Sequence, residues 1–212
     1  MLIKLFNAFV KITAFPVQWA VFRTKVYYED KSAQSRRIKG AAVLVSNHTS
    51  VWDYACYMFV FFFRTLRTQM AEVLFEKKPL GLFLKMMGGI RVNRGANDFA
   101  CVTKSQGILE RGGVVEIYPE SRLPLKGEER PLPFKPGAAY LALLSGAPII
   151  TAFTNGAYFS KKRARVIIGK PLYAHDLIDP SLSEKENIER VSNLTRDKII
   201  SLEKQLYDKQ KR

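Results

Sequence analysis

The chain has 212 residues, 47% of them hydrophobic, which suits one domain with a sizeable buried core and argues against a disordered protein. Its formal net charge of +15 favours an anionic partner, namely nucleic acid, an anionic membrane surface, or phosphorylated or acidic ligands. Cys56 and Cys101 lie too far apart to indicate a disulfide framework, and two cysteines with two histidines lack the spacing of a zinc site.

The first 25 residues are mostly apolar and aromatic, but polar residues and a proline interrupt the run at Lys4, Asn7, Lys11, Pro16 and Gln18. A lysine at the centre of a spanning helix costs roughly 2.5 to 3.5 kcal/mol, and no small-residue cleavage site follows. We therefore expect residues 1–25 to form one or two short helices in the bilayer interface, with charge from Lys4, Lys11, Arg23 and Lys25. The alternative is a helix packed on the protein's own core.

The remaining elements predict an α/β domain over residues 26–212. We expect a connector at 26–39 with a short strand at its start, further strands at 41–46, 114–118, 148–153 and 165–168, and a short extended piece at 90–92. Helices are expected at 54–63, 80–87, 99–111, 137–145 and from the capping box Ser183–Glu186 to the basic end. Strands that alternate with helices indicate a mixed, largely parallel sheet flanked by helices, after the amino-terminal interfacial helical segment.

His48 and Asp53 are the first candidate pair for catalysis. Residues five apart on one ideal helix point about 140° away from each other and do not touch. His48 must therefore lie in the turn after the strand at 41–46, with Asp53 inside the following helix. Ser50 has the capping-box spacing to start that helix, so the alternative is that Asp53 only supports a helix start and His48 is an ordinary loop residue.

Two further segments carry residues suited to anion binding. Gly88-Gly89 allows a tight turn before two guanidinium groups, Arg91 and Arg94, although glycines also simply end helices. The second segment follows the strand at 114–118, where an open α/β sheet places its ligand crevice. It contains Glu120, Ser121 and Arg122, with Lys135 downstream, and a surface ion pair is the alternative for Glu120 and Arg122.

Together these segments resemble the glycerolipid acyltransferase family, which includes the 1-acylglycerol-3-phosphate acyltransferases. Asn47-His48 to Asp53 matches the NHxxxxD block, and Gly89 to Arg94 matches the GxxxxR block. Tyr118 to Arg122, with Phe134-Lys135-Pro136-Gly137, resembles the FPEGTR…FKxG region, and Ala147 to Ile150 resembles the fourth block. The third block departs from the family because it lacks the glycine and is one residue shorter.

The resemblance implies transfer of a fatty acyl group from a thioester to the sn-2 hydroxyl of lysophosphatidic acid, giving phosphatidic acid. It implies that His48 is the general base, that Asp53 orients it, and that Arg94, with Arg91 as the alternative, binds the acceptor phosphate beside Gly89. Arg122 and Lys135 would add charge, and Glu120, next to Ser121, would bind the glycerol part or order these cations. An acyl carrier protein or coenzyme A thioester would be the donor, without a metal or redox cofactor.

Two alternatives remain open from the sequence. One keeps the chemistry and changes the acceptor to glycerol-3-phosphate or another lysolipid. The other, of a different class, is a non-catalytic basic protein that binds membranes or nucleic acid, although the clusters at 36–39 and 161–165 lack the aromatic interleaving of an RNA-binding sheet. We expect no nucleic-acid partner and a place at the cytoplasmic face of a membrane, peripheral or monotopic; the oligomeric state is not predicted.

Overall fold

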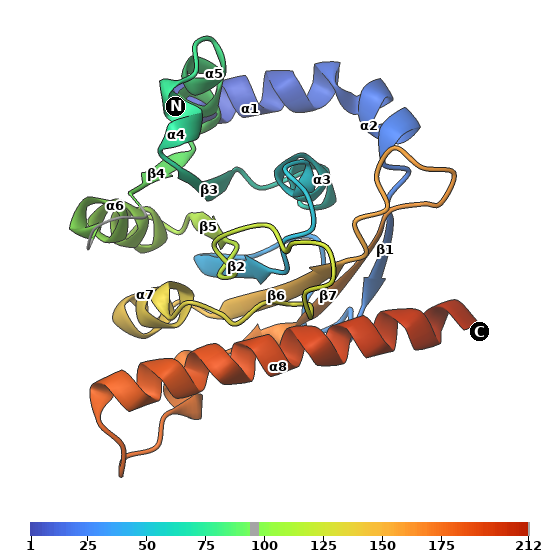
Figure 1. Cartoon of the computed structure of the whole chain (residues 1–212). Helices are drawn as coiled ribbons and strands as arrows, with labels where there is room; N and C mark the ends of the chain where they lie inside the picture. Colours follow the sequence, from blue (N-terminus) through green and yellow to red (C-terminus); the bar gives the residue numbers. More distant parts are fainter. Residues whose placement is uncertain (94–97, 212) are drawn as a thin grey trace.

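The computed structural model gathers the strands into one seven-stranded sheet between two layers of helices, and describes residues 1–93 and 98–211 (Figure 1). The strand order is β1-β7-β6-β2-β5-β3-β4, and every neighbouring pair is parallel except β6 and β7. The strands are β1 (Lys25–Tyr28), β2 (Ala42–Ser46), β3 (Leu66–Ala71), β4 (Ile90–Val92), β5 (Val114–Ile117), β6 (Ile149–Thr154) and β7 (Arg165–Leu172). The expected mixed, largely parallel sheet is confirmed.

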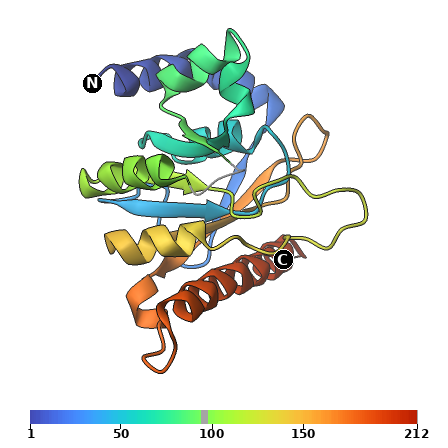
Figure 2. The same ribbon diagram turned by 60° about the vertical axis from the view of Figure 1, so that its left-hand side comes forward.

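Helices cover both faces of the sheet (Figures 1 and 2). One face carries α6, α7 and α8, and the other carries α3, with α1 and α5 packed beyond it. The helices are α1 (Leu2–Thr13), α2 (Phe15–Val21), α3 (Asp53–Val60), α4 (Val73–Glu76), α5 (Leu80–Met87), α6 (Phe99–Glu110), α7 (Gly137–Ser145), the 3₁₀ turn η1 (Ala174–Leu177) and α8 (Glu184–Lys211).

Strand β2 shows how the sequence pattern builds the two cores. Val43 and Val45 face the core under α6, α7 and α8, whereas Ala42 and Leu44 face the core under α3. Alternate residues of a strand point to opposite faces, so a strand buried on both faces must be apolar throughout, as this one is. The central position of β2 fixes the turn that carries His48 at the carboxyl edge of the sheet.

Strand β3 was not expected from the sequence, because polar residues alternate along it. Thr68 is buried and donates a hydrogen bond to the Glu116 carboxylate, while Gln69 donates to Ser105 Oγ at 3.1 Å. Its polar side chains therefore have partners on other elements, which a local hydrophobic pattern does not show. The predicted helix at 54–63 also ends earlier, at Val60. The capping box before α8 is confirmed, with Ser183 N donating to Glu186 Oε2 at 2.8 Å.

Helix α1 places its polar side chains inside and large apolar ones outside. Asn7 and Lys11 are buried, and Lys11 Nζ donates to the carbonyl oxygens of Phe62 at 2.9 Å and Arg64 at 2.6 Å. The expectation that Lys11 supplies charge to a lipid interface is therefore wrong. The outward residues, each more than half exposed, are Leu2, Leu5, Phe9 and Ile12. Within residues 1–93 and 98–211, no helix combines the length and apolarity needed to cross a bilayer.

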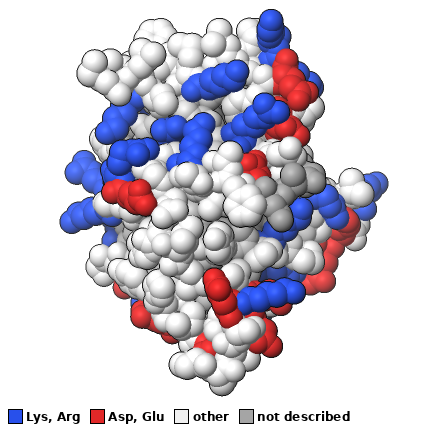
Figure 3. Space-filling view, turned by 90° about the vertical axis from the view of Figure 1, so that its left-hand side faces the viewer, with Lys and Arg blue, Asp and Glu red and all other residues white. Residues whose placement is uncertain are grey.

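The excess positive charge is distributed unevenly over the surface. On the side of the molecule where α5 and α6 lie, lysine and arginine side chains gather over the upper half of the face, while acidic ones lie at its upper right, at its left and toward the lower right and bottom (Figure 3). Such a local excess attracts anionic partners more strongly than the net charge alone would.

We expect Lys11→Ala to lower the free energy of unfolding by about 1–3 kcal/mol, because it leaves the Phe62 and Arg64 carbonyl groups without their buried donor. Urea unfolding measures this loss. Lys4→Ala is the matched control: Lys4 is an exposed lysine of the same helix, and the change should stay within about 0.5 kcal/mol of the wild type. Equal losses in both variants would contradict the role given to Lys11.

Burial raises the pKa of Glu116, in the middle of β5, to about 8 from 4.5. Between these pH values the folded state keeps a proton that the unfolded state releases, so this contribution to stability is complete below pH 4.5 and is lost as the pH rises through about 8. In Glu116→Gln we expect the pH dependence of unfolding to be shallower by up to about 1.4 kcal/mol per pH unit in this window. Urea titrations across it check this, with exposed Glu110→Gln expected to keep the wild-type slope.

Candidate active site

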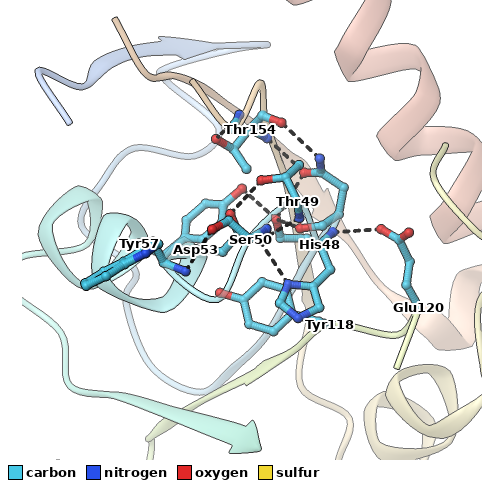
Figure 4. Close-up of polar contacts among 12 residues, drawn as sticks. His48, Thr49, Ser50, Asp53, Tyr57, Tyr118, Glu120 and Thr154 are labelled. Atoms are coloured by element: carbon cyan, nitrogen blue, oxygen red, sulfur yellow. Dashed lines mark hydrogen bonds and ion pairs between the residues drawn. The ribbon is translucent and has the colours of Figure 1, made fainter. Parts of the chain in front are cut away.

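The candidate site lies where three parallel strands end. His48 follows β2, Glu120 follows β5 and Thr154 ends β6, and the carboxyl ends of adjacent parallel strands meet at one edge of the sheet (Figure 4). The topology therefore brings the first and third sequence blocks together, as expected from the sequence.

His48 and Asp53 form the predicted pair. His48 lies in the turn after β2 and Asp53 is the first residue of α3, with 2.9 Å between His48 Nδ1 and Asp53 Oδ2. A carboxylate at this distance favours the tautomer with the proton on Nδ1, which leaves the Nε2 lone pair available as a base. No described residue donates to or accepts from Nε2, and the His48 side chain is 18% exposed.

Asp53 is fully buried and accepts five hydrogen bonds. Besides His48, the donors are the backbone N–H groups of Thr49 at 2.6 Å and Ser50 at 2.9 Å, and the hydroxyl groups of Thr49 and Tyr158, each at 2.7 Å. A buried carboxylate is costly unless its oxygens are saturated in this way. The donors fix its orientation and hence that of the imidazole ring.

Ser50 does not cap α3 as the sequence predicted. The helix begins at Asp53 with Trp52 as its N-cap residue, and Trp52 makes no side-chain cap hydrogen bond. Half of the capping box forms, because the Asp53 carboxylate accepts the Ser50 N–H, but the Ser50 hydroxyl accepts the N–H of Trp52 at 3.2 Å instead. The His48 ring and the turn's N–H groups share the same Asp53 oxygen, so the cap-like contact and the contact of His48 with Asp53 coexist.

Asn47 and Tyr158 attach the loop after β6 to this site. The Asn47 amide pairs with the backbone N–H and C=O of Thr154, each at 2.9 Å. Gly156, at φ +63°, passes so close to Thr49 that a Cβ would lie 2.5 Å from its hydroxyl oxygen. These contacts hold the loop after β6 in the position from which the Tyr158 hydroxyl donates to Asp53. Nothing in the local sequence around Tyr158 pointed to this role.

Glu120 faces the site, but its two oxygens bind backbone groups. They accept the N–H of His48 at 2.7 Å and the N–H of Leu132 at 2.8 Å. Burial raises the pKa of Glu120, while these two N–H groups oppose the shift. The carboxylate thus ties the turn of His48 to the loop that follows β5.

Tyr118 supports the imidazole ring from below. Its ring stacks on His48 with centroids 4.6 Å apart and an interplanar angle of 24° (Figure 4). Its hydroxyl group donates to Glu116 Oε1 at 3.0 Å. The stack leaves the ring little freedom to tilt away from Asp53. Sequence analysis identified Tyr118 only as part of a block.

A small cavity of about 120 Å³ opens beside His48. Its wall includes Glu120 and Arg130 from the loop after β5, and Glu203 and Tyr207 from α8. The loop is held to α8 because the Arg196 guanidinium donates to the Pro131 carbonyl oxygen at 2.7 Å. Sequence analysis missed Arg130, Glu203 and Tyr207, since the contact between this loop and α8 is tertiary.

None of the predicted cations that the structure describes lines this cavity. Arg122 forms two 2.7 Å hydrogen bonds to Glu128 on the surface, an ion pair with Glu128 and not with Glu120, and Arg91 pairs with Glu72 at 2.7 Å. Lys135 is exposed, and its backbone N–H donates to the Pro119 carbonyl oxygen at 2.9 Å. Arg94 lies outside the described residues.

The two remaining predicted residues shape the backbone. Gly89 is buried, and a Cβ at this position would lie 3.1 Å from the Leu84 carbonyl oxygen and 3.2 Å from the Phe75 ring. The absence of a side chain therefore allows the chain to pack closely against the end of α5. Ser121 adopts φ +61°, in the left-handed region that favours glycine, at the place where the family block has one. Ser121 thus adopts a conformation that favours glycine although the glycine is absent.

Comparison with known proteins identifies the family. The family model described as Acyltransferase matches residues 23–154, more than half of the chain. A 1-acyl-sn-glycerol-3-phosphate acyltransferase of Bacillus subtilis is 28% identical over 138 residues, covering 63% of this chain and 66% of the relative. The human 1-acyl-sn-glycerol-3-phosphate acyltransferase beta is 31% identical over 141 residues, covering 63% and 50%. The match thus spans half to two thirds of these relatives.

A solved structure has the same fold. The 1-acyl-sn-glycerophosphate (LPA) acyltransferase PlsC from Thermotoga maritima matches 95% of this chain and 79% of its own, with a TM-score of 0.63 and 19% identity. No group of three or more histidine, cysteine or acidic side chains within the described ranges is arranged to hold a metal ion. From the match of the family model, the chain belongs to the acyltransferase family.

Proposed function

We propose that this protein transfers a fatty acyl group from a thioester to the sn-2 hydroxyl of lysophosphatidic acid and forms phosphatidic acid. The observation that carries the proposal is the 2.9 Å contact of His48 Nδ1 with a buried, saturated Asp53, beside a cavity at the carboxyl edge of the sheet. The names of the relatives support this acceptor, since both are 1-acyl-sn-glycerol-3-phosphate acyltransferases.

In the proposed reaction, Nε2 of His48 removes the proton of the acceptor hydroxyl while its oxygen attacks the thioester carbonyl carbon. The tetrahedral intermediate then breaks its C–S bond, and the thiolate leaves with the proton returned by His48. Asp53 stabilises the imidazolium that exists between these steps. General base catalysis of this kind contributes about 10²- to 10⁴-fold to the rate. The acceptor is itself the nucleophile, so the protein forms no acyl-enzyme and the scheme includes no cofactor.

The acceptor phosphate requires a cation near His48. Arg130 lines the cavity and is our additional candidate for this contact. Arg94, Arg91, Arg122, Lys135 and Gly89 remain the candidates from the family resemblance. For Glu120 we propose a positioning role, since both of its oxygens bind backbone N–H groups.

The exposed apolar face of α1 and α2 supports the proposal that the protein binds a membrane. Large apolar side chains continue from α1 onto α2, where Phe15 is 53%, Val17 61% and Trp19 71% exposed. Exposed apolar surface of this kind is typical of a site that contacts another apolar phase. We propose that residues 1–25 lie in the bilayer interface at the cytoplasmic face. A thioester of acyl carrier protein or coenzyme A is the proposed donor.

Replacing His48 tests the chemistry. We expect His48→Ala to reduce kcat by about 10²- to 10⁴-fold, because it removes the general base, and Asp53→Asn to lower it as well by disturbing the tautomer. Acyl transfer is measured with lysophosphatidic acid and each donor. His175→Ala is the matched control, since His175 is the second histidine and is exposed on η1, and this variant should keep full activity. Equal turnover of wild type and His48→Ala would contradict the assignment.

An acceptor panel at fixed donor tests the substrate. We expect lysophosphatidic acid to have a higher kcat/KM than glycerol-3-phosphate or other lysolipids. A preference for glycerol-3-phosphate would replace the proposed acceptor, and no turnover with any pair of substrates would favour the non-catalytic binding protein.

Replacing outward residues of α1 tests the membrane contact. We expect Leu5→Ser/Phe9→Ser to weaken binding to phospholipid vesicles by at least about tenfold, because a buried apolar side chain contributes about 1.5–3 kcal/mol. Vesicle flotation measures this binding. Leu144→Ser/Ile178→Ser removes two exposed apolar side chains outside α1 and α2 and should bind as the wild type does. Similar losses in both double variants would contradict a specific membrane face.

A further inference from the structure

A second cleft, of about 450 Å³, lies at the far end of α3 from the candidate active site. Helix α3 begins with Asp53 and ends at Val60, and the cleft is lined by Phe59 at this end together with Phe62 and Phe63. Phe15 from α2 and Lys31 from the segment after β1 close its other sides. The cleft shares no lining residue with the cavity beside His48.

The floor of this cleft is aromatic and held in place. Phe15 and Phe62 contact edge to face with centroids 6.4 Å apart, and Phe62 and Phe63 do so at 5.7 Å. The Lys11 ammonium fixes this turn by binding the Phe62 carbonyl oxygen. Phe63 nevertheless remains 67% exposed and Phe15 53% exposed. A fixed, exposed aromatic surface is typical of a site that an apolar ligand covers.

Three cations border this floor. Arg36 donates to the carbonyl oxygens of Val60 at 2.6 Å and Phe59 at 2.8 Å, which places its charge at the end of α3. The Arg37 guanidinium lies 4.7 Å from the centre of the Phe63 ring, and Lys31 Nζ lies 5.7 Å from that of Tyr28.

The charge of these cations is not neutralised by nearby carboxylates. None of the three forms an ion pair within the described part of the chain. The neighbouring acids point elsewhere, since Glu29 pairs with Lys198 at 2.5 Å and Asp30 with Lys170 at 3.6 Å. No acidic side chain lines the cleft. The site therefore combines an apolar floor with an uncompensated positive rim.

We propose that this cleft binds one anionic phospholipid of the membrane, with an acyl chain on Phe15, Phe62 and Phe63 and the phosphate between Lys31 and Arg37. The positive rim favours an anionic ligand, and the aromatic floor favours a ligand that also has an acyl chain. The floor also continues into the outward apolar face of α2, since Phe15 belongs to both. The inference rests on the proposed membrane contact but not on the proposed chemistry.

The test is calorimetric titration of the full chain with short-chain phosphatidylglycerol below its micelle concentration, and with phosphatidylcholine of the same chains. We expect phosphatidylglycerol to bind more tightly. Lys31→Gln/Arg37→Gln should weaken this binding roughly 10- to 30-fold, since each cation near a lipid phosphate contributes about 1 kcal/mol. Lys204→Gln/Lys209→Gln removes the same charge from exposed positions on α8 and should bind within about twofold of the wild type.

Further variants separate the cleft from other sites. Phe63→Ala keeps the charges of the cleft but removes part of its aromatic floor. It should weaken the binding of phosphatidylglycerol and leave the weak binding of glycerol phosphate, which has no acyl chain, unchanged. His48→Ala should bind phosphatidylglycerol as the wild type does, so loss of acyl transfer and loss of lipid binding are distinguishable. Equal affinity of the wild type and Lys31→Gln/Arg37→Gln would overturn the proposal. The proposal would also be overturned if inorganic phosphate bound as tightly as the lipid. The same holds if an oligonucleotide bound in a way that requires Lys31 and Arg37 but not Phe63.

Discussion

The buried carboxylate of Asp53 organises this protein's candidate site. An ionised carboxylate without solvent requires donors on every side, and here they come from the turn after β2, from the His48 ring and from Tyr158 in the loop after β6. Each of these segments is held in position by its hydrogen bond to the Asp53 carboxylate. The orientation of the imidazole ring therefore follows from satisfying one buried charge, rather than from a dedicated contact between two residues.

A second buried arrangement lies beneath that site. Tyr118 stacks on His48 and donates to Glu116, which also accepts from Thr68, so the ring that supports His48 is itself anchored in the centre of the sheet. On the outer side of α3, Lys11 binds the carbonyl oxygens that follow the helix and so attaches α1 to the domain. Helix α1, through Lys11, and the turn that carries His48 thus lie at opposite ends of the same short helix.

Several residues of the family blocks bind or pack against backbone groups. Asn47 pairs with Thr154, Glu120 binds two backbone N–H groups, and Gly89 fits against the Leu84 carbonyl group. The blocks therefore specify the shape of the crevice as much as its chemistry. Ser121 illustrates this, because it adopts a left-handed backbone conformation at the position of a missing glycine.

The sequence by itself determined the sheet type, most elements and the pairing of His48 with Asp53, because these depend on local periodicity and on the reach of a short turn. It could not determine β3, whose buried Thr68 has its partner 48 residues away, or the roles of Tyr158 and Arg130. For α1 the sequence predicted a helix, but only packing against α3 decided that Lys11 faces inward. Hydrogen-bond partners on distant elements leave no periodic trace in the chain, so tertiary structure alone settles where buried polar groups point.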